Sequence, residues 1–478
     1  MMHLLYRRTT QPATASHVHP GWRSACRARP SFAFVAAWIL AGLPWAIGAH
    51  AAPAPARQAL AITNVTVIDV VHGRSVGPGN VVVDDGRIVA VGARDADIPE
   101  QAQRVDGRGR FLIPGLVDMH VHLFNLSSHR PPNDWMFPLF IANGVTAVRE
   151  MRADAASIAL VNRWRKALDA GELIAPRILA AGIAVNGTSP EDAAREVTAA
   201  AEAGADFIKV FSEVPEARWR AILDAARARW LPVAGHVPAG VSLLDAATAG
   251  QRSDEHLMQA YEACSTIETQ LLGERRGLEG DALNARRDAQ EAQALAAFDN
   301  DKCRRVGKAL VATGQVQVPT LVLANEDAMQ QHGAPGADPR WRYLRADEHA
   351  RWEGFLAGYS ANDAALARLR WPVAHRIVAA MRRAGVPILT GTDSPMPGVY
   401  PGFSLHEEMA MLVESGLTPR DALRSATFEP ARFLGIAGAA GAVEPGMRAD
   451  LVLLDADPAR DIRNTARIDA VVLDGRLL

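Results

Sequence analysis

The sequence predicts an α/β protein with a (β/α)8 barrel of the TIM type and a small β-sandwich domain. Short apolar strands alternate with helical stretches through the middle of the 478-residue chain, which is the pattern of a parallel barrel. Strands also occur near both chain ends. We therefore expect residues 52–112 and 440–478 to form the sandwich together and residues 113–439 to form the barrel.

The N-terminal segment, residues 1–51, has the features of a secretory signal peptide. Arginines precede an uncharged apolar run at residues 31–47, and Ala49 and Ala51 supply the small residues of a cleavage site. An uncleaved membrane anchor is the alternative. Cleavage near Ala51 would place the protein in the periplasm or outside the cell, with no membrane attachment after cleavage.

The composition indicates an ordinary globular protein. The formal net charge is −2 and 22% of the residues are charged, so nothing suggests a nucleic acid or an anionic membrane as a partner. We expect a small-molecule substrate, and a homo-oligomer remains open.

Strands are expected at both ends of the chain, at residues 61–69, 80–84, 87–92, 450–455 and 469–474. Asp85 and Gly86 predict the hairpin turn between the second and third of these strands. The barrel strands are expected at residues 115–122, 145–149, 178–181, 207–211, 233–236, 252–256, 316–323 and 388–393. Helices separate them, and residues 215–230 show the apolar spacing of one such helix around Trp219 and Ile222.

The segment at about residues 257–316 is too long for a single connection, so we expect a mostly helical insertion over the open end of the barrel. It carries Cys264 and Cys303, the two cysteines outside the signal peptide, where Cys26 lies. In an oxidising compartment these two residues are a candidate disulfide. Two buried free thiols are the alternative.

A His-x-His motif ends the first barrel strand. Side chains alternate along a strand, so His120 and His122 point to the same side and can hold one metal ion. In a barrel of this type the active site lies at the carboxyl ends of the strands. Other strand ends carry further residues of metal-binding or acid/base type, namely Lys209, His236, His256 and Asp393.

Lys209 lies in an apolar strand of a chain in which only four of the 51 lysine and arginine residues are lysines. Burial lowers the pKa of a lysine towards neutrality, and a neutral amine can capture CO₂ as a carbamate that bridges two metals. A lysine that extends to the barrel rim is the alternative.

A set of motifs resembles the amidohydrolase superfamily, in its imidazolonepropionase-like and prolidase-like branch. These are PGLVDMHVH, GVTAVRE, GADFIKV, AGHVP, SDEHL, ILTGTDS and GAVEPGMRADLVLLD. The resemblance implies a binuclear site with two divalent metal ions, expected to be zinc. It implies that His120, His122 and Asp393 bind one metal, that His236 and His256 bind the other, and that carbamylated Lys209 bridges them.

The function expected from this site is hydrolysis of an amide C–N bond, plausibly in a dipeptide or an N-acyl amino acid. A hydroxide held between the metals would attack the carbonyl, and Asp393 would be the catalytic residue that transfers the proton to the leaving amine. A lactonase or phosphotriesterase with the same site is the alternative. A non-catalytic binding protein is a third interpretation.

Other polar residues have weaker patterns. His129, His406 and Arg149 could each reach a substrate. The alternatives are that His129 is an exposed loop residue and His406 a polar residue near a helix start. For Arg149 the alternative is a structural ion pair. No role is assigned to His332, His349 or His375.

Overall fold

The computed structural model describes residues 58–125, 130–329 and 336–478. The expected signal peptide, Cys26, His129 and His332 lie outside the described residues. Within the described ranges, no helix has the length and apolarity needed to cross a bilayer.

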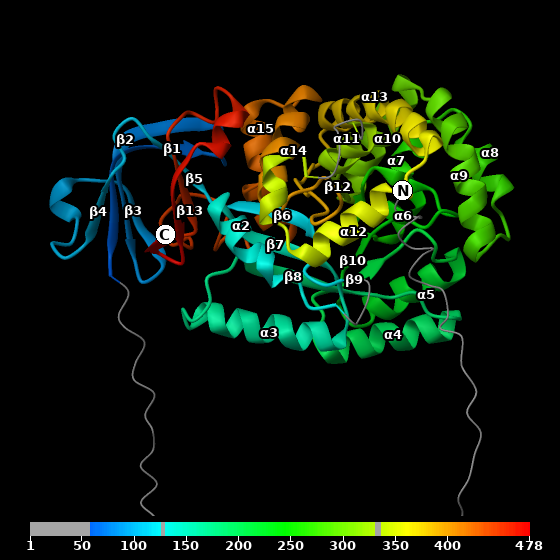
Figure 1. The fold of residues 1–478 in the computed structure, drawn as a ribbon, viewed down its shortest axis with the longest axis horizontal. Coiled ribbons are helices and arrows are strands. Elements are labelled where there is room, and N and C mark those ends of the chain that lie inside the picture. The colour runs from blue at the N-terminus through cyan, green and yellow to red at the C-terminus, as the bar shows by residue number, and fades with distance from the viewer. Residues whose placement is uncertain (1–57, 126–129, 330–335) are drawn as a thin grey trace, which may run out of the picture. The chain divides into compact units, whose positions relative to one another are not determined.

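Both chain ends contribute to one eight-stranded sheet with the order β15-β14-β13-β5-β1-β2-β3, in which β4 also pairs with β1 (Figure 1). Its strands are β1 (Leu60–Asp69), β2 (Arg74–Asp84), β3 (Arg87–Ala93), β4 (Gln103–Asp106), β5 (Phe111–Pro114), β13 (Leu451–Leu454), β14 (Ile468–Leu473) and β15 (Arg476–Leu477). The expected turn at Asp85 and Gly86 joins β2 to β3.

Strand β1 explains why this sheet is continuous. Residues 60–63 of β1 pair with β4 and residues 66–67 pair with β5. Asn64 between them has a φ of 56° and the pairing with β2 shifts register there, so one long strand is shared by two sets of neighbours. The strands of the two terminal regions thus form one hydrogen-bonded sheet, and their arrangement as a β-sandwich stays a prediction.

The middle of the chain forms parallel sheets. One has the order β10-β9-β8-β7-β6 and the other pairs β11 with β12. The strands are β6 (Leu116–Val121), β7 (Val145–Ala153), β8 (Arg177–Ala184), β9 (Phe207–Val210), β10 (Val233–Gly235), β11 (Ser253–Glu255) and β12 (Val316–Val318).

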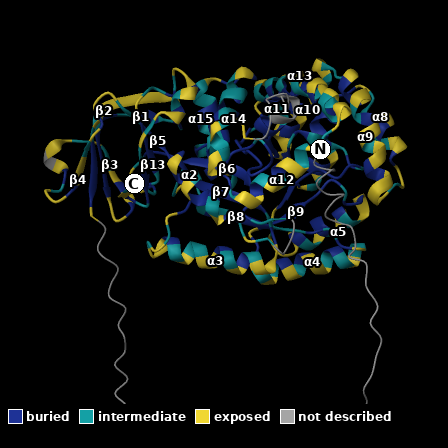
Figure 2. Cartoon of the chain, in the orientation of Figure 1, coloured by how far each residue is buried: buried dark blue, intermediate teal, exposed yellow. Residues whose placement is uncertain are grey.

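Helices follow these strands along the chain. They are α2 (Phe137–Ala142), α3 (Ala155–Asp169), α4 (Pro190–Ala203), α5 (Glu216–Arg227), α6 (Leu243–Ala249), α11 (Leu321–Met329), α13 (Ala361–Ala384), α14 (Phe403–Glu414), α15 (Pro419–Ser425) and α16 (Phe428–Phe433). The helix expected at residues 215–230 is confirmed as α5, which buries Trp219 and Ile222. Exposed residues line the outer faces of α3 and α4, while the strands are buried (Figure 2).

Two expected barrel strands differ from the prediction. The strand expected at residues 316–323 ends at Val318, because Pro319 has no N–H and Thr320 has a φ of 47°, after which α11 begins. Residues 388–393 form only isolated parallel bridges at their two ends. The backbone N–H of Thr392 donates to the Asp118 side chain instead of a neighbouring strand.

The expected helical insertion contains α7 (Met258–Ala263), α8 (Glu268–Glu274), α9 (Gly280–Ala296) and α10 (Asn300–Thr313). A disulfide joins Cys264, just after α7, to Cys303 in α10. A second cover, which the sequence did not indicate, comprises the 3₁₀ helix Pro339–Tyr343 and α12 (Ala346–Leu356).

Candidate functional site

The six residues expected to bind metal lie at or near the carboxyl ends of parallel strands. His120 is in β6 and Lys209 is in β9, while His236 directly follows β10 and His256 directly follows β11. Asp393 lies in the segment that runs beside β6, where its N–H donates to the carbonyl of His120.

One group of potential ligands is compact. His122 Nε2 lies 2.7 Å from Asp393 Oδ1, and His120 Nε2 lies 3.4 Å from the same oxygen. His120, His122 and Asp393 each offer one potential ligand atom, and these three atoms all lie within 4.8 Å of one another. Two imidazoles and a carboxylate at this spacing can hold a divalent cation.

A second group adjoins the first. The ring centroids of His120 and His256 are 4.6 Å apart, and those of His256 and His236 are 5.1 Å apart. Lys209 Nζ and the His236 ring each lie 5.1 Å from the ring of Phe211. The structure therefore brings all six side chains together.

Glu255 orients the first histidine. Its Oε2 lies 2.8 Å from His120 Nδ1, and Arg149 Nη2 donates to its Oε1 at 2.9 Å. A carboxylate on Nδ1 fixes the ring and leaves Nε2 free for a metal. Arg149 was expected either to reach a substrate or to form a structural ion pair, and the structure shows the ion pair, with Glu255, as a buried one.

Sequence reasoning missed Glu255 because strict alternation puts it on the face opposite to His256. His256 has a φ of 64°, so the chain turns after the strand and both side chains reach the site. Asp393 has a φ of 67°. Left-handed backbone at residues other than glycine costs about 1–3 kcal/mol and is concentrated at functional sites.

Thr320 orients His256 in the same way. Its Oγ1 lies 2.7 Å from His256 Nδ1, which again leaves Nε2 for another partner. Glu408 accepts a hydrogen bond from the N–H of Val322 at 2.8 Å and so fixes the start of α11 next to Thr320. The sequence could not predict the left-handed φ of Thr320, because a threonine within an apolar run gives no sign of that backbone conformation.

Asp118 connects β6 to the segment of Asp393. Its carboxylate accepts hydrogen bonds from the N–H of His120 at 3.1 Å and from the N–H and hydroxyl of Thr392 at 3.0 and 2.6 Å. This buried side chain fixes His120 relative to Asp393.

Burial keeps His120, His236 and His256 neutral near pH 7. It lowers the pKa of His120 to about 3 and that of His256 to about 4, and it holds the pKa of His236 well below its ordinary value. It also lowers the pKa of Lys209 to about 8. Neutral imidazole is the form that binds metal, and a neutral amine is a nucleophile.

The site contains buried nitrogens that have no hydrogen-bond partner among the described residues. They are His120 Nε2, His122 Nδ1, His256 Nε2, Lys209 Nζ and both ring nitrogens of His236. Buried polar atoms are seldom left unpaired, so each needs an explanation. A metal ligand set explains His120 Nε2, His256 Nε2 and one ring nitrogen of His236, and the donor atoms fit divalent cations of the zinc type.

A family model described as the amidohydrolase family matches residues 111–478. The chain belongs to the amidohydrolase family. It is accordingly a hydrolase that acts on carbon–nitrogen bonds, and this family uses divalent metal.

Known proteins agree with this amidohydrolase assignment. An imidazolonepropionase of Ralstonia nicotianae is 27% identical over 421 residues, which cover 83% of this chain and 92% of that protein. The crystal structure of a putative prolidase from Bifidobacterium longum has a TM-score of 0.63 at 22% identity, covering 89% of this chain and 95% of that one. Bottromycin amidohydrolase has a TM-score of 0.65 at 23% identity, covering 89% and 88%. At these identities the two structures show a shared fold.

Three further histidines within the described part of this amidohydrolase have structural partners. His406 is buried, with Nδ1 2.9 Å from Thr465 Oγ1 and Nε2 3.1 Å from the carbonyl of Asn143. His349 and His375, which were assigned no role, contact the carbonyl of Trp341 and the hydroxyl of Ser415 respectively.

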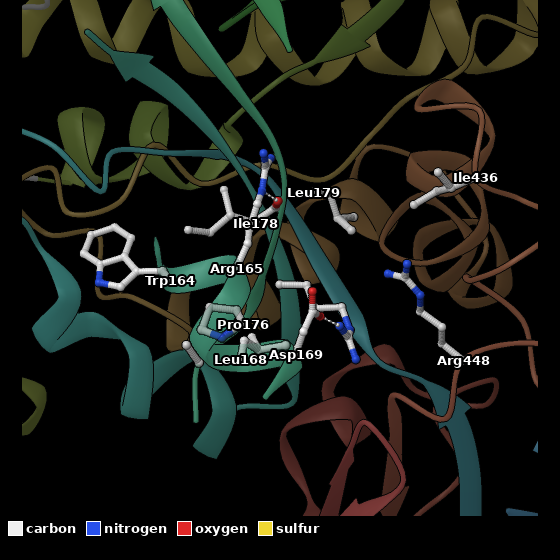
Figure 3. Close-up of a pocket in the computed structure, with 11 residues that line it drawn as sticks. Trp164, Arg165, Leu168, Asp169, Pro176, Ile178, Leu179, Ile436 and Arg448 are labelled. Atoms are coloured by element: carbon white, nitrogen blue, oxygen red, sulfur yellow. Dashed lines mark hydrogen bonds and ion pairs between the residues drawn. The ribbon is translucent and has the colours of Figure 1, made fainter. Parts of the chain in front are cut away.

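A separate cavity of about 240 Å³ lies where β8 begins, away from the strand ends that carry the metal ligands (Figure 3). Its charged groups are largely paired. Arg165 bonds Asp206 at 2.8 Å, and Arg177 bonds Asp450 at 2.8 Å and Asp474 at 2.6 Å. The pairs of Arg177 link β8 to the terminal sheet, so this region is a structural junction.

Proposed function

We propose that this amidohydrolase is a binuclear metal enzyme that hydrolyses an amide bond in a small substrate, plausibly a dipeptide or an N-acyl amino acid. The observation that carries the proposal is the group of buried nitrogens without partners around Asp393. Four histidines, a lysine and an aspartate supply more donors than one tetrahedral ion needs.

We infer that the parallel strands close into a (β/α)8 barrel around this site. The bridge between Val233 and Gln251 joins β10 to the segment before β11. The bridge between Gln317 and Ile388 joins β12 to the last segment, and the bridge between Val121 and Ser394 joins that segment to β6. These three bridges connect the two parallel sheets in a closed order, as a barrel requires.

His120, His122 and Asp393 would hold one cation, and His236 and His256 would hold the second. Carbamylated Lys209 would bridge the two. When bound, such cations polarise a carbonyl and make water acidic enough to be a nucleophile near neutral pH. Zinc is the expected ion because imidazole and carboxylate donors suit it.

Asp393 is the proposed proton carrier. Burial raises its pKa, but the contacts with His120 and His122 outweigh burial and keep the pKa well below the ordinary range, so the side chain is a carboxylate that can accept a proton. It would take the proton of the attacking water at a carboxylate oxygen and deliver it to the leaving nitrogen.

Lys209 would form the carbamate from its neutral fraction. The amine nitrogen bonds to the carbon of CO₂, and the proton that it loses goes to solvent. A pKa of about 8 leaves about one tenth of the amine neutral at pH 7, and this fraction reacts.

A substrate panel on the metal-loaded mature protein tests the proposed function. We expect hydrolysis of dipeptides or N-acyl amino acids and its loss in Asp393→Asn. Turnover of lactones or phosphotriesters alone would overturn the amide assignment. No turnover of any substrate, with bound metal present, would favour a binding protein.

We also propose that the protein is periplasmic or secreted. The expected cleavage near Ala51 and the disulfide between Cys264 and Cys303 both suit an oxidising compartment. N-terminal sequencing of protein isolated from the periplasm or medium tests this, and a retained residue 1 would contradict it.

A further inference from the structure

Helix α12 of the second cover is joined to the loop that carries Asp393. Arg351 Nη2 donates a hydrogen bond to the carbonyl of Pro395, two residues after Asp393. The next residue of the helix, Trp352, is 1% exposed, and its ring lies 5.1 Å from the ring of Tyr400, measured between centroids. Tyr400 lies further along the same loop, before α14 begins, so the helix contacts this loop at two points.

The same helix is joined to the segment that follows His122. Glu348 lies one turn before Arg351 and has no exposed surface. It accepts hydrogen bonds from Arg351 Nε at 2.7 Å and from Arg130 Nη2 at 2.6 Å. Asn133, three residues after Arg130, donates from its side chain to the carbonyl of His122 at 2.8 Å. A series of contacts therefore connects α12 to His122.

The two ends of this series of contacts meet at one proposed metal site. His122 Nε2 lies 2.7 Å from Asp393 Oδ1, and both residues are proposed ligands of the same ion. Asp393 has a left-handed φ of 67°, a conformation that persists where the surrounding structure holds it. Its own N–H donates to the carbonyl of His120 in β6, and Arg351 holds the loop directly after it.

The side chain of Arg351 is itself fixed in one orientation. A guanidinium is planar and carries several N–H donors, so Nε can bind Glu348 while Nη2 reaches the carbonyl of Pro395. Glu348 is buried and shared with Arg130. Movement of Arg351 away from the loop would leave this buried carboxylate with fewer partners, which is costly.

We propose that Arg351 is a positioning residue for the metal site, which fixes Asp393 relative to His122 from the cover. The inference rests on the proposed function, in which both residues are ligands and Asp393 carries the proton. Partners that orient metal ligands are worth about 10- to 100-fold in metal affinity or activity. The full metal affinity of the site therefore depends on α12, an element that contributes no ligand of its own to the proposed set.

Competition between the cobalt-loaded protein and a chelator, followed by visible absorption, tests this role without a substrate. We expect Arg351→Gln to weaken the binding of one cobalt ion by about 10- to 100-fold. Arg351→Lys keeps the charge and a donor and should recover part of the loss. Arg342→Gln is the matched control, because Arg342 is exposed in the same cover and donates to the hydroxyl of the adjacent Tyr343. It should bind cobalt as the wild type does.

A second variant covers the case in which Arg351→Gln does not fold. Glu348→Gln loosens Arg351 without removing it, so we expect a smaller loss of cobalt affinity of the same kind. Wild-type cobalt affinity in the folded variants of Arg351 and Glu348, or an equal loss in Arg342→Gln, would overturn the positioning role.

Hydrolysis of N-acetyl amino acids gives a further readout. We expect Arg351→Gln to lower kcat by about 10- to 100-fold with little change in KM, because a displaced Asp393 affects the chemical step. A change in KM alone would contradict the role of Arg351 and leave amide hydrolysis intact. If no amide is hydrolysed by the wild type, the proposed function fails, and the cobalt competition still decides whether Arg351 positions the metal ligands.

Discussion

At the scale of single residues, burial sets the chemistry of the basic groups in the site. Lys209 is fully buried, its Nζ has no hydrogen-bond partner among the described residues, and burial lowers its pKa to about 8. An ordinary structural lysine would have an acidic partner or reach solvent. These properties suit an amine that reacts with CO₂.

Replacing Lys209 by alanine should therefore remove the proposed bridging group. We expect activity to fall by at least the ~100-fold that loss of a metal-ligand partner costs. Added short carboxylic acids should restore part of it by occupying the space of the carbamate. Full activity of Lys209→Ala without any added acid would rule out the carbamate.

The residues of the site differ in how far the sequence could predict them. Strand alternation and the position of strand ends were sufficient for His120, His122, Lys209 and His236. Glu255 and Thr320 depend on left-handed backbone at His256 and at Thr320 itself. Local sequence pattern carries no signal for such a conformation in these residue types.

At the scale of elements, the insertion is stabilised by one buried ion pair. Arg275 is 2% exposed and Glu262 is 4% exposed, and two hydrogen bonds of 2.7 Å join them. Removing one member leaves the other charge buried without compensation, which costs about 3–5 kcal/mol.

Arg275→Met should consequently lower the free energy of unfolding by about 3–5 kcal/mol in a urea titration. The neighbouring Arg276 is exposed, so Arg276→Met is the matched control and should change stability by no more than about 0.5 kcal/mol. Equal unfolding midpoints for the two variants would show that the ion pair does not hold the insertion in place.

Elements were predictable where the apolar pattern was unambiguous. The helix α5 and the strands β1, β3, β13 and β14 match their expected positions closely, whereas β2 begins at Arg74, six residues before the expected start. A short apolar run such as residues 321–323 fits a strand and a buried helix equally well, so hydrophobic periodicity alone could not decide between the two structures. Residues 388–393 are not a regular strand, since Asp393 has a left-handed φ of 67° and the side chain of Asp118 takes the N–H of Thr392, a contact between residues 274 positions apart.

At the scale of the whole molecule, the covers over the site were the least predictable part. An insertion was expected from its length, but the direction of α9 depends on contacts of Arg275 with Ala239 and Glu262. The cover formed by α12 is held by Arg130, which pairs with Glu348 at 2.6 Å across 218 residues of sequence. Such long-range pairs decide which helices face the substrate.

The central claim is that six side chains on one end of the parallel strands hold two divalent ions. Metal analysis of the purified mature protein by inductively coupled plasma mass spectrometry tests it most directly. We expect about two zinc or similar ions per chain, about one after substitution of His236 and His256 together by alanine, and unchanged content in Arg276→Met. A wild-type content of one ion or none after loading with excess zinc and removal of unbound metal would contradict the binuclear site.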